Sequence, residues 1–148
     1  MKVSVIVTTH NTERYLLKCM DSIFNQTLSD IEIIIADDAS TDSTPQIATE
    51  LAKTHENVLF LPLSTSLGPG GARNKALQQA SGEYISFIDS DDWMDLNYLE
   101  VMYNKAQQLN ADIVTCSLMR EYDYITTSPV YRVCESFSVN KYYLIGLL

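Results

Sequence analysis

The sequence predicts an α/β fold, in which an open and mostly parallel sheet carries helices on both faces. Short continuous runs of apolar, often β-branched residues recur along the chain. Such runs are typical of parallel strands that are buried on both faces. Between successive runs lie segments whose apolar residues repeat with helical spacing. This alternation of strand and helix favours right-handed crossovers and a Rossmann-like arrangement.

Five apolar runs are predicted to be strands, because each is short and bounded by polar or turn-forming residues. They cover residues 3–7, 31–36, 58–61, 84–88 and 113–116. The first run is also too short for a signal peptide or a membrane span, so no transmembrane segment is predicted.

Four helices are predicted between the strands. The first has an apolar face made of Leu16, Cys19, Met20, Ile23 and Phe24. The second begins at Thr44-Pro45, where a capping residue precedes a proline. The third covers residues 71–80, and the fourth is capped by Asp95. The inward face of the fourth helix is predicted to contain Leu96, Leu99, Met102, Ala106 and Leu109.

Length and charge limit the classes of function. The chain has 148 residues, enough for one domain with a real core. Its net charge is −9, so neither nucleic acid nor an anionic membrane is a predicted partner, since both need a basic face. The three cysteines are widely spaced and form no CxxC pair, which argues against a zinc site or a disulfide framework. A cytoplasmic, reducing setting fits this pattern.

The ends of the predicted strands carry the candidate site. Ligands of open parallel sheets bind beyond the carboxyl ends of the strands, where the strand order switches. Four such ends are polar, acidic or glycine-rich, and they cover residues 8–11, 37–42, 64–74 and 89–92. Turns account for polar residues at these places, but they do not require paired acids at two of them.

The Asp89-Ser90-Asp91 sequence is a candidate metal site. On an extended or turning backbone, side chains at i and i+2 share a face, so Asp89 and Asp91 can present carboxylates to one side. Hard oxygen ligands suit Mg²⁺ or Mn²⁺, which completes its coordination with water and substrate phosphate. The alternative is that Asp92 or Asp95 caps the next helix and the other acids are solvated. The motif alone leaves both interpretations open.

Asp37 and Asp38 follow the second predicted strand. One interpretation is that a carboxylate forms a turn with the Ser40-Thr41 region. The other is that a carboxylate accepts hydrogen bonds from a base or ribose, as an acid after the second strand of nucleotide-binding folds does.

The glycine-rich GPGGARN segment and His10 are also ambiguous. GxxxxGK[ST] is absent, and a GxGxxG match that starts at Gly68 would place Arg73 at the third glycine. The segment is either a turn that starts a helix or a loop whose Arg73 and amides face a nucleotide. His10 lacks metal-ligand spacing, so it is either a hydrogen-bonded loop residue or a ring that stacks on a base.

Three segments of the chain closely resemble the nucleotide-binding half of the family 2 glycosyltransferases and occur in the same order. The first runs from VSVIVTTHN to ADDASTDST, the second is GPGGARNKAL, and the third is SGEYISFIDSDDW. The resemblance covers about residues 2–116 and implies the GT-A fold. It implies an enzyme that transfers a sugar, with inversion, from a nucleotide-diphospho-sugar to a saccharide or lipid-linked acceptor. The donor would be UDP-linked and the cofactor Mg²⁺ or Mn²⁺. The parent protein would lie in the cytoplasm or peripherally at the inner membrane face.

The resemblance also implies roles for particular residues. The nucleotide-binding set would be Thr8, His10, Asn11, Asp37, Asp38 and Arg73. Within it, Asp38 would bond the uracil, and His10 stands where the family often has tyrosine. Asp89 and Asp91 would be the metal-binding pair, with Asp91 the direct ligand and Asp89 assisting.

The chain departs from the family pattern after Cys116. The family's general base is an Asp or Glu in the second half of the domain, and no matching acidic motif follows here, although Glu121, Asp123 and Glu135 are present. We therefore expect a single domain over residues 1–148 that is truncated at its C-terminus, with the base outside the chain. Such a chain should bind UDP with Mn²⁺ but transfer sugar poorly.

The final YYLIGLL segment, residues 142–148, is apolar and has no polar tail. The sequence leaves two interpretations: a chain cut at this point, or a C-terminal helix docked on the core. Left uncovered, the segment could drive homodimerisation.

Two other functions stay open. One is a nucleotide-sugar-binding or scaffold module without turnover. The other is a nucleotidyltransferase, which would need a basic, glycine-rich loop near the N-terminus, and VTTHNTERY is not one.

Overall fold

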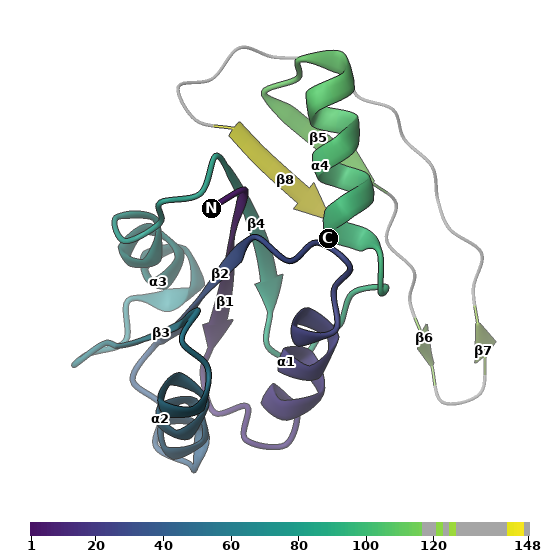
Figure 1. The fold of residues 1–148 in the computed structure, drawn as a ribbon. Helices are drawn as coiled ribbons and strands as arrows, with labels where there is room; N and C mark the ends of the chain where they lie inside the picture. The colour runs from purple at the N-terminus through teal and green to yellow at the C-terminus, as the bar shows by residue number, and fades with distance from the viewer. Residues whose placement is uncertain (117–120, 123–124, 127–141, 147–148) are drawn as a thin grey trace.

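The computed structural model describes residues 1–116, 121–122, 125–126 and 142–146 (Figure 1). Its main sheet has six strands in the order β3-β2-β1-β4-β8-β5, and all neighbouring pairs are parallel. These strands are β1 (Val3–Thr9), β2 (Ile31–Asp37), β3 (Val58–Pro62), β4 (Tyr84–Asp89), β5 (Ile113–Cys116) and β8 (Tyr142–Gly146). A short antiparallel pair joins β6 (Glu121–Tyr122) to β7 (Ile125–Thr126). The predicted fold class is confirmed.

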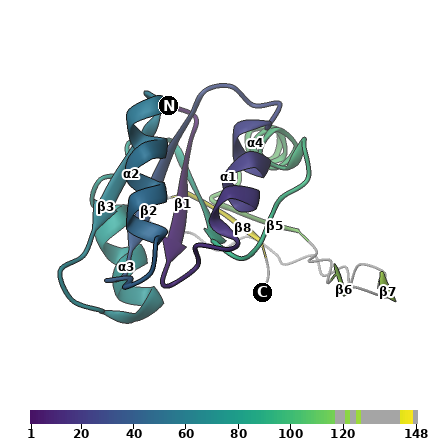
Figure 2. The same ribbon diagram turned by 90° about the horizontal axis from the view of Figure 1, so that it is seen from below.

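Four described helices cover the two faces of the sheet (Figures 1 and 2). They are α1 (Leu16–Phe24), α2 (Thr44–Thr54), α3 (Gly68–Leu77) and α4 (Tyr98–Leu109). Because successive side chains of a strand point to opposite faces, β1 serves two cores. Val5 belongs to a cluster with residues of α1, α2 and α4, whereas Ile6 packs with Ala72 and Ala76 of α3.

The segment at residues 142–146 corrects the prediction for the C-terminal region. It is a strand and not a helix: β8 pairs in parallel with β4 on one side and with β5 on the other. A short apolar run fits a buried strand as well as a helix, and periodicity cannot separate the two. The strand lies between β4 and β5 in the sheet and pairs with the backbone amide and carbonyl groups on the facing edges of both, which would otherwise lack partners. Homodimerisation stays a prediction.

Two predicted helix boundaries were wrong. Helix α3 begins at Gly68 rather than Gly71, with Pro69 in its first turn, where a missing amide hydrogen costs nothing. Helix α4 begins at Tyr98, and Asp95 does not cap it with its side chain. Leu96 and Leu109, both predicted to face inward, are 61% and 60% exposed. Both errors arise because the groups that bond these helix starts come from distant parts of the chain, as shown below.

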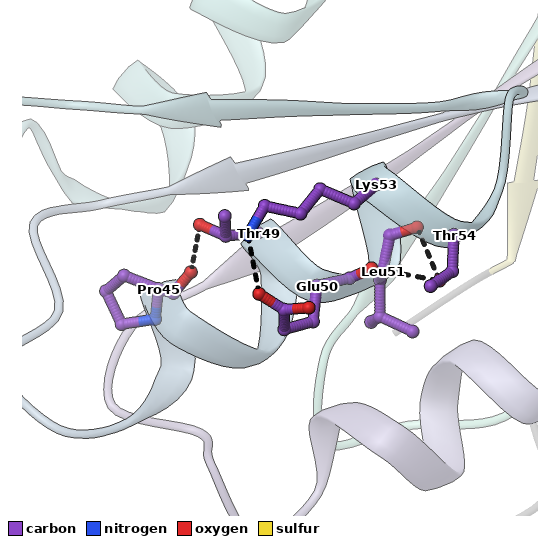
Figure 3. Close-up of polar contacts among 6 residues, drawn as sticks. All are labelled: Pro45, Thr49, Glu50, Leu51, Lys53 and Thr54. Carbon is purple, nitrogen blue, oxygen red and sulfur yellow. Dashed lines mark hydrogen bonds and ion pairs between the residues drawn. The ribbon is translucent and has the colours of Figure 1, made fainter.

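Helix α2 begins as predicted at Thr44-Pro45, and several of its polar contacts are internal (Figure 3). Thr49 donates to the Pro45 carbonyl at 2.7 Å, and Thr54 donates to the carbonyls of Glu50 and Leu51 in the last turn at 2.9 and 3.2 Å. Threonine hydroxyls in helices commonly donate in this way to carbonyls three or four residues earlier. They stabilise α2 itself and place no side chain in the candidate site.

A polar cluster at the amino edge of the sheet fixes the start of β4. The Glu32 carboxylate accepts from the Ser4 hydroxyl at 2.5 Å and from the amides of Ser81 and Gly82 at 2.6 and 3.0 Å. Gly82 lies so close to β1 that an added Cβ would be 2.5 Å from the Ser4 nitrogen. No side chain fits there unless the backbone moves.

Gly82→Ala should therefore destabilise the fold by roughly 1–3 kcal/mol, because the methyl group meets backbone rather than a flexible side chain. The measurement is urea unfolding. Gly70→Ala is the matched control, since an added Cβ there meets nothing within 4 Å and should stabilise α3 by roughly 0.5 kcal/mol. Equal stability of the two variants would show that the close approach is not a constraint.

Candidate functional site

The candidate site lies where the strand order reverses. The chain moves outward from β1 to β2 and β3 and then returns to place β4 on the other side of β1. Thr8 pairs in register with Asp89 of β4, and Thr9 pairs with Asp37 of β2. In Figure 1 the arrows of β1 and β4 lie side by side and point the same way. The fold thus brings Thr8, Asp37 and Asp89 to one edge, the place where open sheets bind ligands.

Asp89 is held from two sides. Its Oδ1 accepts from the Thr8 hydroxyl at 2.7 Å and from Arg73 Nη2 at 2.6 Å. Oδ2 has no hydrogen bond to any residue in the described part of the chain. The Arg73 Nε atom is buried and likewise has no partner among the described residues. Asp89 and Arg73 therefore orient each other, while Asp89 Oδ2 and Arg73 Nε have no hydrogen bond within the described residues.

The two acids after Asp89 have no side-chain partner among the described residues. Asp91 and Asp92 are exposed and make no side-chain hydrogen bond within the residues that the structure describes. Partial burial raises the pKa of Asp92, and the charges of Asp91 and Asp89 raise it further. Like charges repel, so this cluster favours a positive ligand or proton uptake. No three His, Cys, Asp or Glu side chains in the described ranges form a metal-binding group, although Mg²⁺ needs only one or two carboxylates.

Cys19 lies beneath the same cluster. Its Sγ donates to the Asp89 carbonyl at 3.7 Å. Burial raises the pKa of this thiol to about 12, and the charges of Asp92, Asp91 and Asp89 add to the effect. A thiol that stays protonated at neutral pH is neither a nucleophile nor a metal ligand. Cys19 is thus a packing residue.

Asp38 is buried and binds the start of α3. Its carboxylate accepts from the Ser66 hydroxyl at 2.6 Å and from the amides of Leu67 and Gly68 at 2.6 and 3.0 Å. Burial acts to raise the pKa of Asp38, but these hydrogen bonds outweigh it and lower the pKa. A carboxylate at a helix N-terminus also faces the positive end of the helix dipole. Asp38 thereby fixes the helix that carries Arg73.

Asp37 forms the turn that the sequence left open. It accepts from the Thr9 hydroxyl at 2.8 Å, and from the amide and hydroxyl of Ser40 at 3.0 and 2.5 Å. Ala39, between them, has a left-handed φ of 57°. Asp37 is buried and ties the end of β2 to β1.

His10 and Asn11 form the exposed end of β1. His10 Nδ1 lies 2.7 Å from the Asp38 carbonyl, and Nε2 lies 3.2 Å from Asn11 Nδ2. A carbonyl can only accept and an amide nitrogen can only donate, so Nδ1 carries the proton. Asn11 Oδ1 accepts from the Thr41 amide at 2.8 Å, and Asn11 itself adopts a φ of 54°, which asparagine tolerates. The imidazole is therefore fixed in one orientation while remaining exposed.

Sequence reasoning missed several residues that contact this edge. Ser66 lies in a strand-end segment and could have been found by position, whereas Ser40 had been named as the turn partner of Asp37. Ser90, whose hydroxyl donates to Thr12 at 2.9 Å, lies between the two predicted metal ligands. Gln26 lies far from every strand end, and no pattern marked it. Asp123 and Glu135, considered as acids after Cys116, lie outside the described residues.

Three carboxylates give an acid-stability prediction. Asp38, Asp42 and Glu32 each have a lowered pKa, because hydrogen bonds to the carboxylate outweigh the burial that acts to raise it. A lowered folded-state pKa gives stability that is complete above the ordinary value, 3.8 for Asp38, and is lost as the pH falls through the folded value. The free energy of unfolding should therefore fall between about pH 5 and pH 3. Asp92, with its raised pKa, opposes this trend.

Urea unfolding at a series of pH values across this range is the measurement, and Asp38→Asn should make the free energy of unfolding depend less steeply on pH. A free energy of unfolding that does not change with pH would contradict the lowered pKa values assigned to these carboxylates.

Comparison with known proteins identifies the family. The sequence model described as "Glycosyl transferase family 2" matches residues 4–142. The chain belongs to glycosyl transferase family 2. The fold implied by the resemblance to this family is thereby confirmed.

Relatives of this chain include curated sequences and solved structures. It is 41% identical over 112 residues to "Glycosyltransferase GlyA" of Streptococcus pneumoniae, a match that covers 76% of this chain and 16% of GlyA. The structure of Staphylococcus aureus TarS 1–349 in complex with UDP-GlcNAc superposes with a TM-score of 0.76 at 32% identity, and the match covers 86% of this chain and 37% of that one. A mannosyltransferase from Pyrobaculum calidifontis, in complex with GDP-Man and Mn²⁺, gives a TM-score of 0.69 at 27% identity, covering 80% and 36%.

The chain thus spans well under half the length of these glycosyltransferases. Within the part of the chain that the structure describes, no helix is both long and apolar enough to cross a membrane.

Proposed function

We propose that this chain binds a UDP-sugar at the carboxyl ends of β1, β2 and β4, and that the parent enzyme transfers the sugar with inversion to a saccharide or lipid-linked acceptor. The observation that carries the proposal is the convergence of Thr8, Arg73 and Asp89 with the His10–Asp38 pair at the strand-order switch. The TarS structure, which holds UDP-GlcNAc, supports this choice of donor. The proposed setting is the cytoplasm, at the inner membrane face for a lipid-linked acceptor.

The nucleoside would bind at the exposed end of β1. The residues proposed to hold the donor are Thr8, His10, Asn11, Asp37, Asp38 and Arg73. His10 presents a fixed, exposed ring suited to stacking on a base. Asp38 already accepts three hydrogen bonds, and a carboxylate has about four acceptor positions, so one position is left for the uracil.

The diphosphate would bind between Arg73 and the acids. The residues present fit Mg²⁺ or Mn²⁺, because Asp91 is exposed and Asp89 keeps Oδ2 unbonded within the described chain. When bound, such an ion would neutralise the charge that develops on the leaving diphosphate. Arg73 orients Asp89, and its Nε, which has no partner among the described residues, is a further donor on the same side chain. We further propose that the general base lies outside residues 1–148, since no acidic motif of the family follows Cys116.

Mapping of amide resonances tests the location. Addition of UDP and Mn²⁺ to isotope-labelled chain should shift or broaden the amides of Thr8, His10, Asp38, Leu67 and Asp91. The amides of Glu50 and Lys53, on the outer part of α2, serve as the internal control and should not move. Shifts confined to the apolar groove that Leu17, Ile47 and Leu51 line between α1 and α2 would contradict the proposed site.

Binding without turnover is the competing function. Asp91→Ala in the parent protein separates the two, because an enzyme should lose activity while remaining folded. Unchanged biological function in that variant would favour a scaffold.

A further inference from the structure

We infer that Gln26 is a positioning residue for the acid loop, here residues 89–97, and that it holds this loop in the shape that the donor's metal requires. The inference rests on the proposed function, because the acid loop carries the proposed metal ligands Asp89 and Asp91. Gln26 lies just beyond α1 and does not reach those carboxylates itself. Its action is through the backbone of the loop.

The Gln26 carboxamide is buried and fully used. Nε2 donates to the Asp95 carbonyl at 2.6 Å and to the Ser22 carbonyl at 3.0 Å, while Oε1 accepts from the Leu99 amide at 2.9 Å. Only 9% of the residue is exposed. An amide side chain offers both donors and acceptors, and here both kinds join α1 to the segment after β4. Neither a carboxylate nor an alkyl chain could make this set of bonds.

Neighbours of Gln26 hold the rest of the loop in the same way. The Met94 amide donates to the Ser22 hydroxyl at 3.2 Å, and the Thr27 amide donates to the Leu96 carbonyl at 3.0 Å. The thiol of Cys19 donates to the Asp89 carbonyl at 3.7 Å. Contacts from α1 and the turn after it therefore run from the start of the acid loop to its end.

The loop has few restraints of its own. Between β4 and α4 it forms no regular structure apart from two turns, in which the Asp92 amide donates to the Asp89 carbonyl and the Tyr98 amide donates to the Asp95 carbonyl, both at 3.0 Å. Its three acids, Asp89, Asp91 and Asp92, stand within four positions of the chain and repel one another. Repulsion within an irregular segment favours spreading of the charges. The bonds from α1 oppose that spreading before any ion is present.

Gln26 also takes the place of a missing helix cap. Asn97, at the cap position of α4, makes no side-chain bond to the helix. The free amide of Leu99 is instead satisfied by Gln26 Oε1. One side chain thus fixes both the end of the acid loop and the first turn of α4, so the two cannot move independently.

The test uses Gln26→Ala in the 148-residue chain and calorimetry with UDP, with and without Mn²⁺. We expect the strengthening of UDP binding by Mn²⁺ to fall about tenfold, which is the usual effect of removing a group that orients metal ligands. UDP binding without metal should be unchanged, since Asp38, His10 and Arg73 do not contact Gln26. A purely structural role would not produce this split.

Glu32→Ala is the matched control. It removes three of the bonds that fix the start of β4 at the opposite edge of the sheet, so it lowers the melting temperature without contacting the acid loop. Its Mn²⁺ effect should match that of the unmodified chain. Ser22→Ala provides a milder variant that stays usable if Gln26→Ala does not fold, and it should weaken the Mn²⁺ effect in the same direction.

The outcomes are distinguishable. If the Gln26 and Ser22 variants keep the full Mn²⁺ effect and lose only thermal stability, the positioning role is overturned and the proposed function stands. If the unmodified chain shows no UDP binding with Mn²⁺, the proposed function fails, and the inference fails with it.

Discussion

Asp91→Ala is expected to remove the Mn²⁺-dependent part of UDP binding, a loss of at least about 100-fold, because it deletes the proposed direct ligand. The fold should be unaffected. Asp91 is exposed and bonds to no other side chain in the described residues, so the free energy of unfolding should change by less than about 0.5 kcal/mol. Calorimetry with UDP and Mn²⁺, together with urea unfolding, measures both effects.

Asp21→Ala is the control for Asp91→Ala. Asp21 is an exposed aspartate on α1, so the control changes net charge equally without touching the acid loop. UDP binding with Mn²⁺ should stay at the level of the unmodified chain. An equal loss in both variants would mean that net charge, rather than coordination by Asp91, governs donor binding.

Asp38→Ala is expected to cost roughly 3 kcal/mol of stability and to weaken UDP binding with or without metal. The change leaves the Ser66 hydroxyl and the amides of Leu67 and Gly68 without their acceptor in a buried place. It also frees the start of α3, the helix that carries Arg73. Urea unfolding and calorimetry with UDP alone are the measurements.

Two further variants calibrate the effect of Asp38. Asp38→Asn keeps one acceptor oxygen and should lose less stability than Asp38→Ala. Asp30→Ala removes an exposed aspartate before β2 and should change stability by less than about 0.5 kcal/mol. If Asp38→Ala proved as stable as Asp30→Ala, Asp38 would not be the anchor of α3.

The strands that build the site could be predicted from the sequence because they are short, apolar and buried. Val3–Thr9 and Ile31–Asp37 are nearly fully buried, and their ends determine where Thr8 and Asp37 lie. The segment at residues 142–146 could not be assigned, because a short apolar run does not distinguish strand from helix. Its place between β4 and β5 depends on the rest of the sheet.

The contacts of the site were less predictable than its location. The paired acids at the ends of two strands marked the correct edge of the sheet. Asp38 binds the start of α3, and Arg73 binds Asp89 at 2.6 Å. Both contacts join residues that are far apart in the sequence, so no local sequence pattern predicts them. The contact of Gln26 with α4 could not be predicted for the same reason. The sequence assigned the cap of α4 to the nearby Asp95, but the Leu99 amide is bonded by Gln26 from a distant part of the chain.

Calorimetric titration of UDP into this chain, with and without Mn²⁺, tests the central claim most directly. The account predicts one UDP bound per chain, with tighter binding when Mn²⁺ is present. GDP and UDP-sugars titrated in the same way would define the base and the sugar that the site prefers. Absence of binding by any of these nucleotides in the presence of Mn²⁺ would contradict the assignment of a donor site at the ends of β1, β2 and β4.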